Sequence, residues 1–329
     1  MGASGVTIAY STHRPETLSR ASLLMREHAS IVLEEPETPG FHAMLRGEMD
    51  IEEYLLATEY EYPAFAERAA AMLQELAATR RVIQLDPYMD VLVSIHEFFT
   101  DGFGPADLEP DTVQAVVYDV EHRWTTALLN YYETSGTRSF DDLVHAVIAF
   151  ARVDAERGRM RDAMRARGLL GLMHGDDPLP RPVYVEAGSI HFHLLNQLSR
   201  LLDSPPRVAY LMEDVSRRVW GRRQVLGPGD VLTMLFTYFP QYDKPRAALL
   251  AAQSLIHVKI QQKEEIVEEL ENPAPHTCDE AWSAGLAMAL NHEECRELYE
   301  RISRLPTPHA RRLAEKYLNH LGRLPLRHF

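Results

Sequence analysis

Short apolar runs of β-prone residues alternate with helix-like stretches in the N-terminal part of the chain. The runs are Val6–Tyr10, Ile31–Leu33 and Val82–Leu85, and segments with apolar residues at helical spacing separate them. Strands that alternate with helices predict a parallel sheet, because parallel neighbours need a crossover connection that a helix supplies. We therefore expect an α/β fold with a central, mostly parallel sheet and crossover helices.

Beyond the third run the pattern is mostly helical, with two further strand-like runs at Val183–Ala187 and Val208–Met212. Residues 89–173 read as a large helical insertion with a turn at Ser135–Thr137, and the pattern is helical again from Lys244 to Arg323.

These patterns predict two domains. We expect an α/β core over residues 1–243 with the helical insertion at about 89–173, and a helical C-terminal region over 244–329 packed on the core. The C-terminal helices could instead form a homodimer interface. Within them, the charged run Lys263–Glu271 is predicted to be a solvated helix face.

Charge and cysteine content exclude several classes of protein. The 34 Lys and Arg against 48 Asp and Glu give a net charge of −14, which disfavours nucleic acid and membrane surfaces as partners. The expected partner is therefore a small-molecule or peptide substrate. Cys278 and Cys295 form neither a disulfide framework nor a zinc-ribbon spacing, and no signal peptide is evident, so we expect a cytoplasmic protein.

Polar, titratable residues follow each predicted strand. Ligands of an open parallel sheet bind at the carboxyl ends of its strands. The residues found there are His13 after the first run, Glu34 and Glu35 after the second, Asp86 after the third, Gly188 and His191 after the fourth, and Glu213 after the fifth.

Imidazole and carboxylate side chains together can bind a divalent metal or act as general base and acid. Each of these residues also has a structural interpretation, as a helix cap or an exposed charge at a strand end. Because consecutive strand residues point to opposite faces, at most one of Glu34 and Glu35 is expected to enter a shared site.

Several common catalytic motifs are absent from the sequence. It contains no His-Glu-x-x-His, no Gly-x-Gly-x-x-Gly, no Walker loop and no Gly-x-Ser-x-Gly. This argues against zincins, dinucleotide-dependent enzymes, P-loop NTPases and α/β-hydrolases.

The order of the strand-end motifs resembles the superfamily of TraB/PrgY proteins, Tiki metalloproteases, ChaN haem-binding lipoproteins and erythromycin esterases. Its late Gly-x-x-His is intact as Gly188–His191, and its glutamate matches Glu34 or Glu35. Its early Gly-x-x-His appears as Tyr10–His13, with Tyr in place of Gly. Its Arg-bearing helix motif appears as Glu156–Met160.

The resemblance implies a hydrolase for peptide, ester or amide bonds. His13, Glu35 and His191 would hold a divalent metal (Mn²⁺, Co²⁺ or Zn²⁺). Glu34 or Glu35, whichever is not a ligand, would be the general base. Arg157, or Arg161 in a second register of the motif, would stabilise the oxyanion or bind a substrate carboxylate. The other branches imply a metal-independent esterase, or a haem-binding or partner-binding protein without catalysis.

Overall fold

The computed structural model describes residues 5–58 and 62–323, which form two compact units. Unit 1 is formed by the described residues of Met1–Asp119 and Gly158–Leu211, and unit 2 by those of Val120–Arg157 and Met212–Phe329. Residues 212–243, which the sequence pattern places with the α/β core, therefore lie in unit 2.

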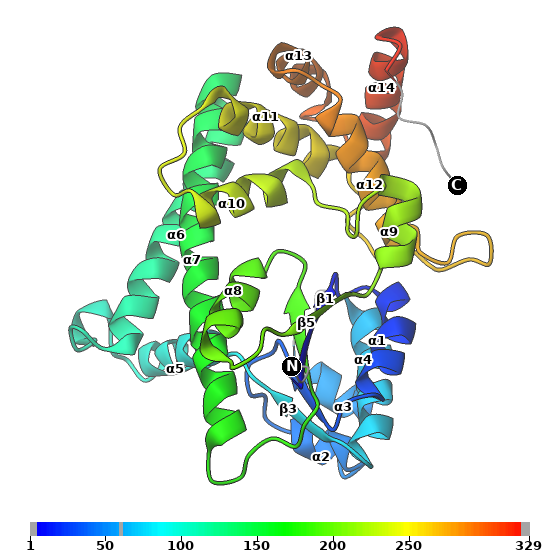
Figure 1. Cartoon of the computed structure of the whole chain (residues 1–329). Coiled ribbons are helices and arrows are strands. Elements are labelled where there is room, and N and C mark those ends of the chain that lie inside the picture. Colours follow the sequence, from blue (N-terminus) through cyan, green and yellow to red (C-terminus); the bar gives the residue numbers. More distant parts are fainter. Residues whose placement is uncertain (1–4, 59–61, 324–329) are drawn as a thin grey trace. The chain divides into compact units, whose positions relative to one another are not determined.

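Unit 1 contains a sheet of five strands, all parallel, within the described residues (Figure 1). The strands are β1 (Val6–Ser11), β2 (Ser30–Leu33), β3 (Arg81–Gln84), β4 (Val183–Gly188) and β5 (Arg207–Tyr210). Their order across the sheet is β3-β2-β4-β1-β5. This confirms the predicted α/β class.

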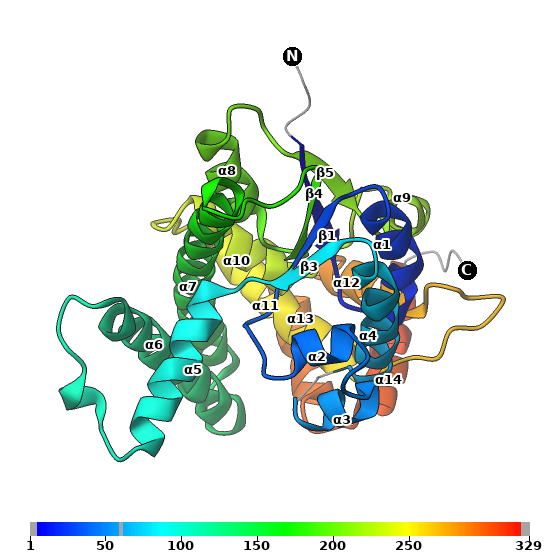
Figure 2. The same ribbon diagram turned by 90° about the horizontal axis from the view of Figure 1, so that it is seen from below.

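Helices cover both faces of this sheet. The helices of unit 1 are α1 (Leu18–Met25), α2 (Phe41–Leu45), α3 (Ile51–Leu56), α4 (Pro63–Ala77), α5 (Pro87–Thr100) and α8 (Phe192–Leu201), with 3₁₀ turns at Pro15–Thr17 and Pro105–Asp107. The residues of α6 (Val113–Thr137) and α7 (Phe140–His174) are divided between the units. Figure 2 shows α1 and α4 on one side of the strands and α7 and α8 on the other.

Alternation along the strands explains this layering. Ala9 and Ile31 pack with α1, α2 and α4 on one face, whereas Ile8 and Val32 pack with α7 and α8 on the other. Because both faces are covered, all six residues of β1 are buried, as is usual for a parallel sheet. Full burial of one such aliphatic side chain contributes about 1.5–3 kcal/mol.

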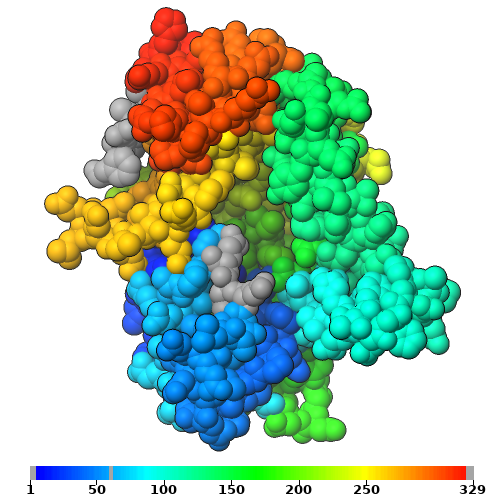
Figure 3. All heavy atoms as spheres, turned by 180° about the vertical axis from the view of Figure 1, so that it is seen from behind, coloured from blue at the N-terminus to red at the C-terminus, as the bar shows by residue number. Residues whose placement is uncertain are grey.

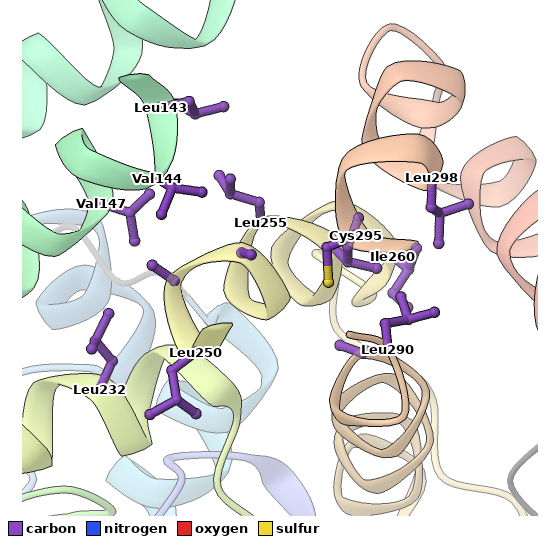
Figure 4. Close-up of a cluster of buried hydrophobic side chains, with 14 of the residues drawn as sticks. Leu143, Val144, Val147, Leu232, Leu250, Leu255, Ile260, Leu290, Cys295 and Leu298 are labelled. Carbon is purple, nitrogen blue, oxygen red and sulfur yellow. The ribbon is translucent and has the colours of Figure 1, made fainter. Parts of the chain in front are cut away.

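Unit 2 is helical among the described residues. In addition to its parts of α6 and α7 it contains α9 (Glu213–Trp220), α10 (Pro228–Tyr238), α11 (Pro245–Ile260), α12 (Pro275–Met288), α13 (His292–Ile302) and α14 (Thr307–His320). Its core centres on α11, whose Leu250, Leu255 and Ile260 meet Val147 of α7 and Leu298 of α13 (Figure 4). No described helix of the chain is long and apolar enough to cross a membrane.

The segment between β2 and α4 contains two short helices, α2 and α3, because Gly47 adopts a φ of +71° after α2 and ends it. Two local predictions were wrong. The turn predicted at Ser135–Thr137 is the last turn of α6. There the Thr137 hydroxyl donates to the Glu133 carbonyl at 2.6 Å, which keeps a polar residue within the helix.

The charged run Lys263–Glu271 is also not helical. It belongs to the connection between α11 and α12, which lies at the surface in Figure 3 (gold). The side chains of Val267 and Leu270 are exposed there. Solvation of the run was predicted correctly, but its helical conformation was not.

Candidate functional site

The parallel register places the carboxyl ends of the strands of unit 1 at one edge of the sheet. Ser11 of β1 is level with Gly188 of β4, and Leu33 of β2 is level with Gln84 of β3. The predicted residues after β1 to β4 therefore share this edge, and they form two connected groups of charged side chains.

The first group centres on His191, which follows β4 and immediately precedes α8. Its Nδ1 lies 2.5 Å from Oδ1 of Asp162, a residue of α7. Its Nε2 lies 3.1 Å from Oε1 of Glu34. Glu34 also accepts a hydrogen bond from the backbone N–H of Gly188 through Oε2, at 2.5 Å. Gly188 is placed so that a Cβ would lie only 3.0 Å from the His191 ring, which explains glycine at this position.

Two arginines of α7 complete this group. Arg161 donates from Nε to Asp86 at 2.6 Å, and its Nη2 lies 3.4 Å from Oε1 of Glu34. Arg165 donates to the carbonyl oxygens of Leu85 at 3.0 Å and Glu186 at 2.9 Å, with Nη1 3.4 Å from Oε2 of Glu34. Arg165 thus ties α7 to the ends of β3 and β4.

The charges of this buried group balance when the His191 ring is protonated. Three carboxylates, of Glu34, Asp86 and Asp162, then face two guanidiniums and one imidazolium. Burial alone lowers the pKa of His191, but Glu34 and Asp162 outweigh it and raise that pKa. Burial raises the pKa of Glu34, but the charges of His191 and the two arginines hold it well below its usual range.

The second group centres on His13, which follows β1. Its φ is +50°, an uncommon value for a residue other than glycine, and its backbone N–H donates to Oγ of Ser11 at 3.0 Å. The residue with the left-handed backbone is His13 itself. Tyr10, which stands where the resembling motif has glycine, is an ordinary strand residue of β1.

One carboxylate, that of Glu186, faces the His13 ring. Its Nε2 lies 3.7 Å from Oε1 of Glu186, a residue of β4, and 34% of its side chain is exposed. Burial alone lowers the pKa of His13, but Glu186, supported by Glu34 and Glu35, raises it to about 9. Oε2 of Glu186 also accepts from the backbone N–H of Glu34 at 3.4 Å, which links the two groups.

Glu35 contacts neither His191 nor His13 directly. Its Oε2 accepts a hydrogen bond from Nε2 of Gln84 at 2.8 Å, and Gln84 is oriented by the N–H of Thr38, which donates to Oε1 at 3.0 Å. Burial raises the pKa of Glu35, and neighbouring Glu186 adds to this effect. Glu34 and Glu35 therefore occupy different environments.

Two predicted residues belong to unit 2. Arg157 pairs there with Glu121, at 2.5 Å between Nε and Oε1. The carboxylate of Glu213 pairs there with Arg217 and Arg223. The arginine that contacts Glu34 from the predicted motif is Arg161, the alternative register.

Asp162, Arg165 and Glu186 were missed. Glu186 had a detectable signal, because it is the one charged residue in the apolar strand Val183–Gly188. Arg165 lies four residues after Arg161, on the same face of α7. Asp162 directly follows Arg161 in the second register of the helix motif, but only the arginine of that register was taken as a site candidate.

The three predicted metal ligands do not converge on one point. Both ring nitrogens of His191 face carboxylates of the protein, His13 faces Glu186, and Glu35 accepts from Gln84. Within residues 5–58 and 62–323, no three His, Cys, Asp or Glu side chains are grouped to hold a metal ion. The donor set therefore does not fit a resident metal.

Comparison with known proteins leaves the family open. An uncharacterized protein of Archaeoglobus fulgidus is 28% identical over 295 residues, which cover 90% of this chain and 98% of that protein. No family model and no solved structure matches the chain. The match extends over nearly the whole of both chains, and the relative's description assigns no function.

Proposed function

We propose that unit 1 is a metal-independent hydrolase that cleaves an ester or amide bond of a small-molecule or peptide substrate. The observation that carries this proposal is the proximity of His13 to Glu186 and Glu35 at the carboxyl edge of the sheet. Titratable groups whose environments displace their pKa values are typical of acid–base sites.

In the proposed reaction, His13 and Glu35 handle the protons. Glu35 in its ionised form takes a proton from water as the oxygen attacks the scissile carbonyl, and its raised pKa makes it a stronger base than an ordinary carboxylate. The His13 imidazolium, present at neutral pH because of its pKa of about 9, gives a proton to the leaving group. Glu35 then releases its proton to water and His13 takes up a proton from water, which restores both residues and completes the cycle.

The buried group acts as the support of these residues. Glu34 is held by His191 and Arg165, and its backbone N–H orients Glu186, which in turn faces His13. His191 is thus a positioning residue in this proposal. The motifs at His13, Glu34 and Gly188–His191, in the order found in the erythromycin esterase branch, support the same assignment.

The test is hydrolysis of p-nitrophenyl acetate and of a peptide anilide by the full chain, after EDTA treatment and desalting. We expect activity without metal, lowered about 10²–10⁴-fold in His13→Ala. His96→Ala, on the exposed side of α5, is the matched control and should retain full activity.

Two outcomes would contradict the proposal. Activity that requires added Mn²⁺, Co²⁺ or Zn²⁺ would favour a metal-dependent hydrolase. Equal activity of both histidine variants would place the chemistry elsewhere. We also propose a cytoplasmic location, because Cys278 and Cys295 are buried, free thiols.

A further inference from the structure

Among the arginines at the carboxyl edge of the sheet, Arg14 differs from Arg161 and Arg165. The latter two donate to carboxylates and carbonyl oxygens of the protein, and Nη1 of Arg165, which makes no hydrogen bond to a described residue, lies 3.4 Å from Oε2 of Glu34. Arg14 has a buried Nη1 that finds no hydrogen-bond partner in the described part of the chain. Buried nitrogens of a guanidinium normally have an acceptor, so this one requires an explanation.

The backbone of Arg14 is held in one conformation. Pro15 follows it and restricts it to the extended region, and its φ of −116° and ψ of 151° lie there. Its carbonyl oxygen accepts a hydrogen bond from the Thr17 hydroxyl at 2.7 Å. The guanidinium stacks on the ring of Tyr62, with Cζ 3.5 Å from the ring centroid. Aromatic stacking orients a guanidinium without neutralising its charge.

Arg14 and His13 lie over the same turn of α4. His13 makes an edge contact with Phe65, with ring centroids 5.7 Å apart, whereas Arg14 covers Tyr62. Tyr62 is the N-cap of α4 and Phe65 is its third residue, so the two aromatic side chains are one helical turn apart. The proposed acid and an oriented guanidinium are therefore neighbours in space as well as in sequence.

We infer that Arg14 binds an oxyanion group, a carboxylate or a phosphate, of the substrate whose scissile bond lies at His13. A planar guanidinium offers parallel N–H donors that match the oxygens of such a group. The N-terminal end of α4 adds a favourable partial charge. The inference rests on the proposed function and specifies its substrate class as anionic esters or amides.

Binding of small anions tests the inference without catalysis. Succinate, inorganic phosphate and neutral succinamide are titrated calorimetrically into the full chain and into Arg14→Gln, Arg14→Lys and Arg20→Gln. We expect one anion per chain for the wild type, about tenfold or more weaker binding in Arg14→Gln, and partial retention in Arg14→Lys. Arg20→Gln, on the exposed side of α1, should bind like the wild type, and succinamide should not bind.

The comparison of succinate with phosphate identifies which oxyanion the residue prefers. Absence of saturable binding of both anions to the folded wild type would overturn the inference, as would equal affinity in Arg14→Gln. A melting temperature for each variant shows that it is folded, and Arg14→Lys provides the decision if Arg14→Gln unfolds.

Kinetics separate this inference from the proposed function. With p-nitrophenyl hydrogen succinate, Arg14→Gln should raise KM with little change in kcat, whereas the control Arg20→Gln should leave both constants unchanged. If hydrolysis depends on His13 but KM is the same in the wild type and Arg14→Gln, the inference about Arg14 is overturned and the proposed function stands. If anions bind in an Arg14-dependent way but no ester or amide is hydrolysed, the proposed function is overturned and the anion site stands.

Discussion

Asp162 holds the ring of His191 from one side, with Nδ1 and Oδ1 only 2.5 Å apart. The other carboxylate oxygen of Asp162 accepts the backbone N–H of Leu194, in the first turn of α8, at 2.9 Å. One buried carboxylate thus pairs with both a backbone N–H at the start of α8 and the imidazole of His191. It orients this ring so that Nε2 faces Glu34.

Replacement of Asp162 by Asn should therefore lower the pKa of His191, because one of the two carboxylates that raise it is lost. Breaking this buried pair should reduce the free energy of unfolding by about 3–5 kcal/mol. Imidazole NMR titration and urea unfolding measure the two effects. Asp176→Asn, at an exposed position after α7, is the control, and the same result for both variants would refute a special role for Asp162.

Glu34 and Glu35 should respond in opposite ways to replacement by Gln. Glu34→Gln leaves His191 and Arg165 short of a negative charge in a buried place, which should cost about 3–5 kcal/mol of stability. Glu35→Gln removes a carboxylate whose burial disfavours its charged form, so stability at neutral pH should be unchanged or higher.

Hydrolase activity distinguishes the two residues further. Under the proposed function, Glu35→Gln should lose activity while its melting temperature is maintained, because the general base is gone. Chemical denaturation and initial rates on the same preparations are the measurements. A stability loss in Glu35→Gln equal to that of Glu34→Gln would show that our assignment of their environments is wrong.

Alternation of short apolar runs with helices was enough to predict the sheet, and its strand ends located His13, Glu34, Asp86 and His191. The sequence did not show which of Glu34 and Glu35 contacts the buried charged group. A strand pattern indicates that the two side chains point in opposite directions, but their contact partners depend on how α7 packs on the sheet.

The arginine of the site could not be chosen from the sequence for a similar reason. Arg157, Arg161 and Arg165 are spaced by four residues and share one face of α7. Which of them reaches a strand end depends on where the helix crosses the sheet, and this is set by long-range packing. Asp162 was missed because its partners, His191 and Leu194, are about thirty residues away.

Gly188→Ala should disturb the site from within. A Cβ at this position would lie 3.0 Å from Cδ2 of His191 and 3.6 Å from Oε2 of Glu34, so the imidazole must shift. We expect a loss of about 1–3 kcal/mol and a chemical-shift change of the His191 ring. Gly158→Ala in α7, where a Cβ meets nothing within 4 Å, should instead stabilise the helix by about 0.5–1 kcal/mol. Unchanged His191 signals in Gly188→Ala would contradict the close contact.

The ion pair of His13 and Glu186 should make stability depend on pH in the alkaline range. The pKa of His13 is raised from 6.5 to about 9 in the folded protein, so the folded state binds the proton more tightly than the unfolded state. The resulting stabilisation is fully present below pH 6.5 and is lost as pH rises through 9. Urea unfolding of the wild type and His13→Gln across this range measures it. The stability difference between the two proteins should shrink as pH rises, and a constant difference would contradict a raised pKa. Under the proposed function, kcat/KM should fall over the same range, because the leaving group then lacks its proton donor.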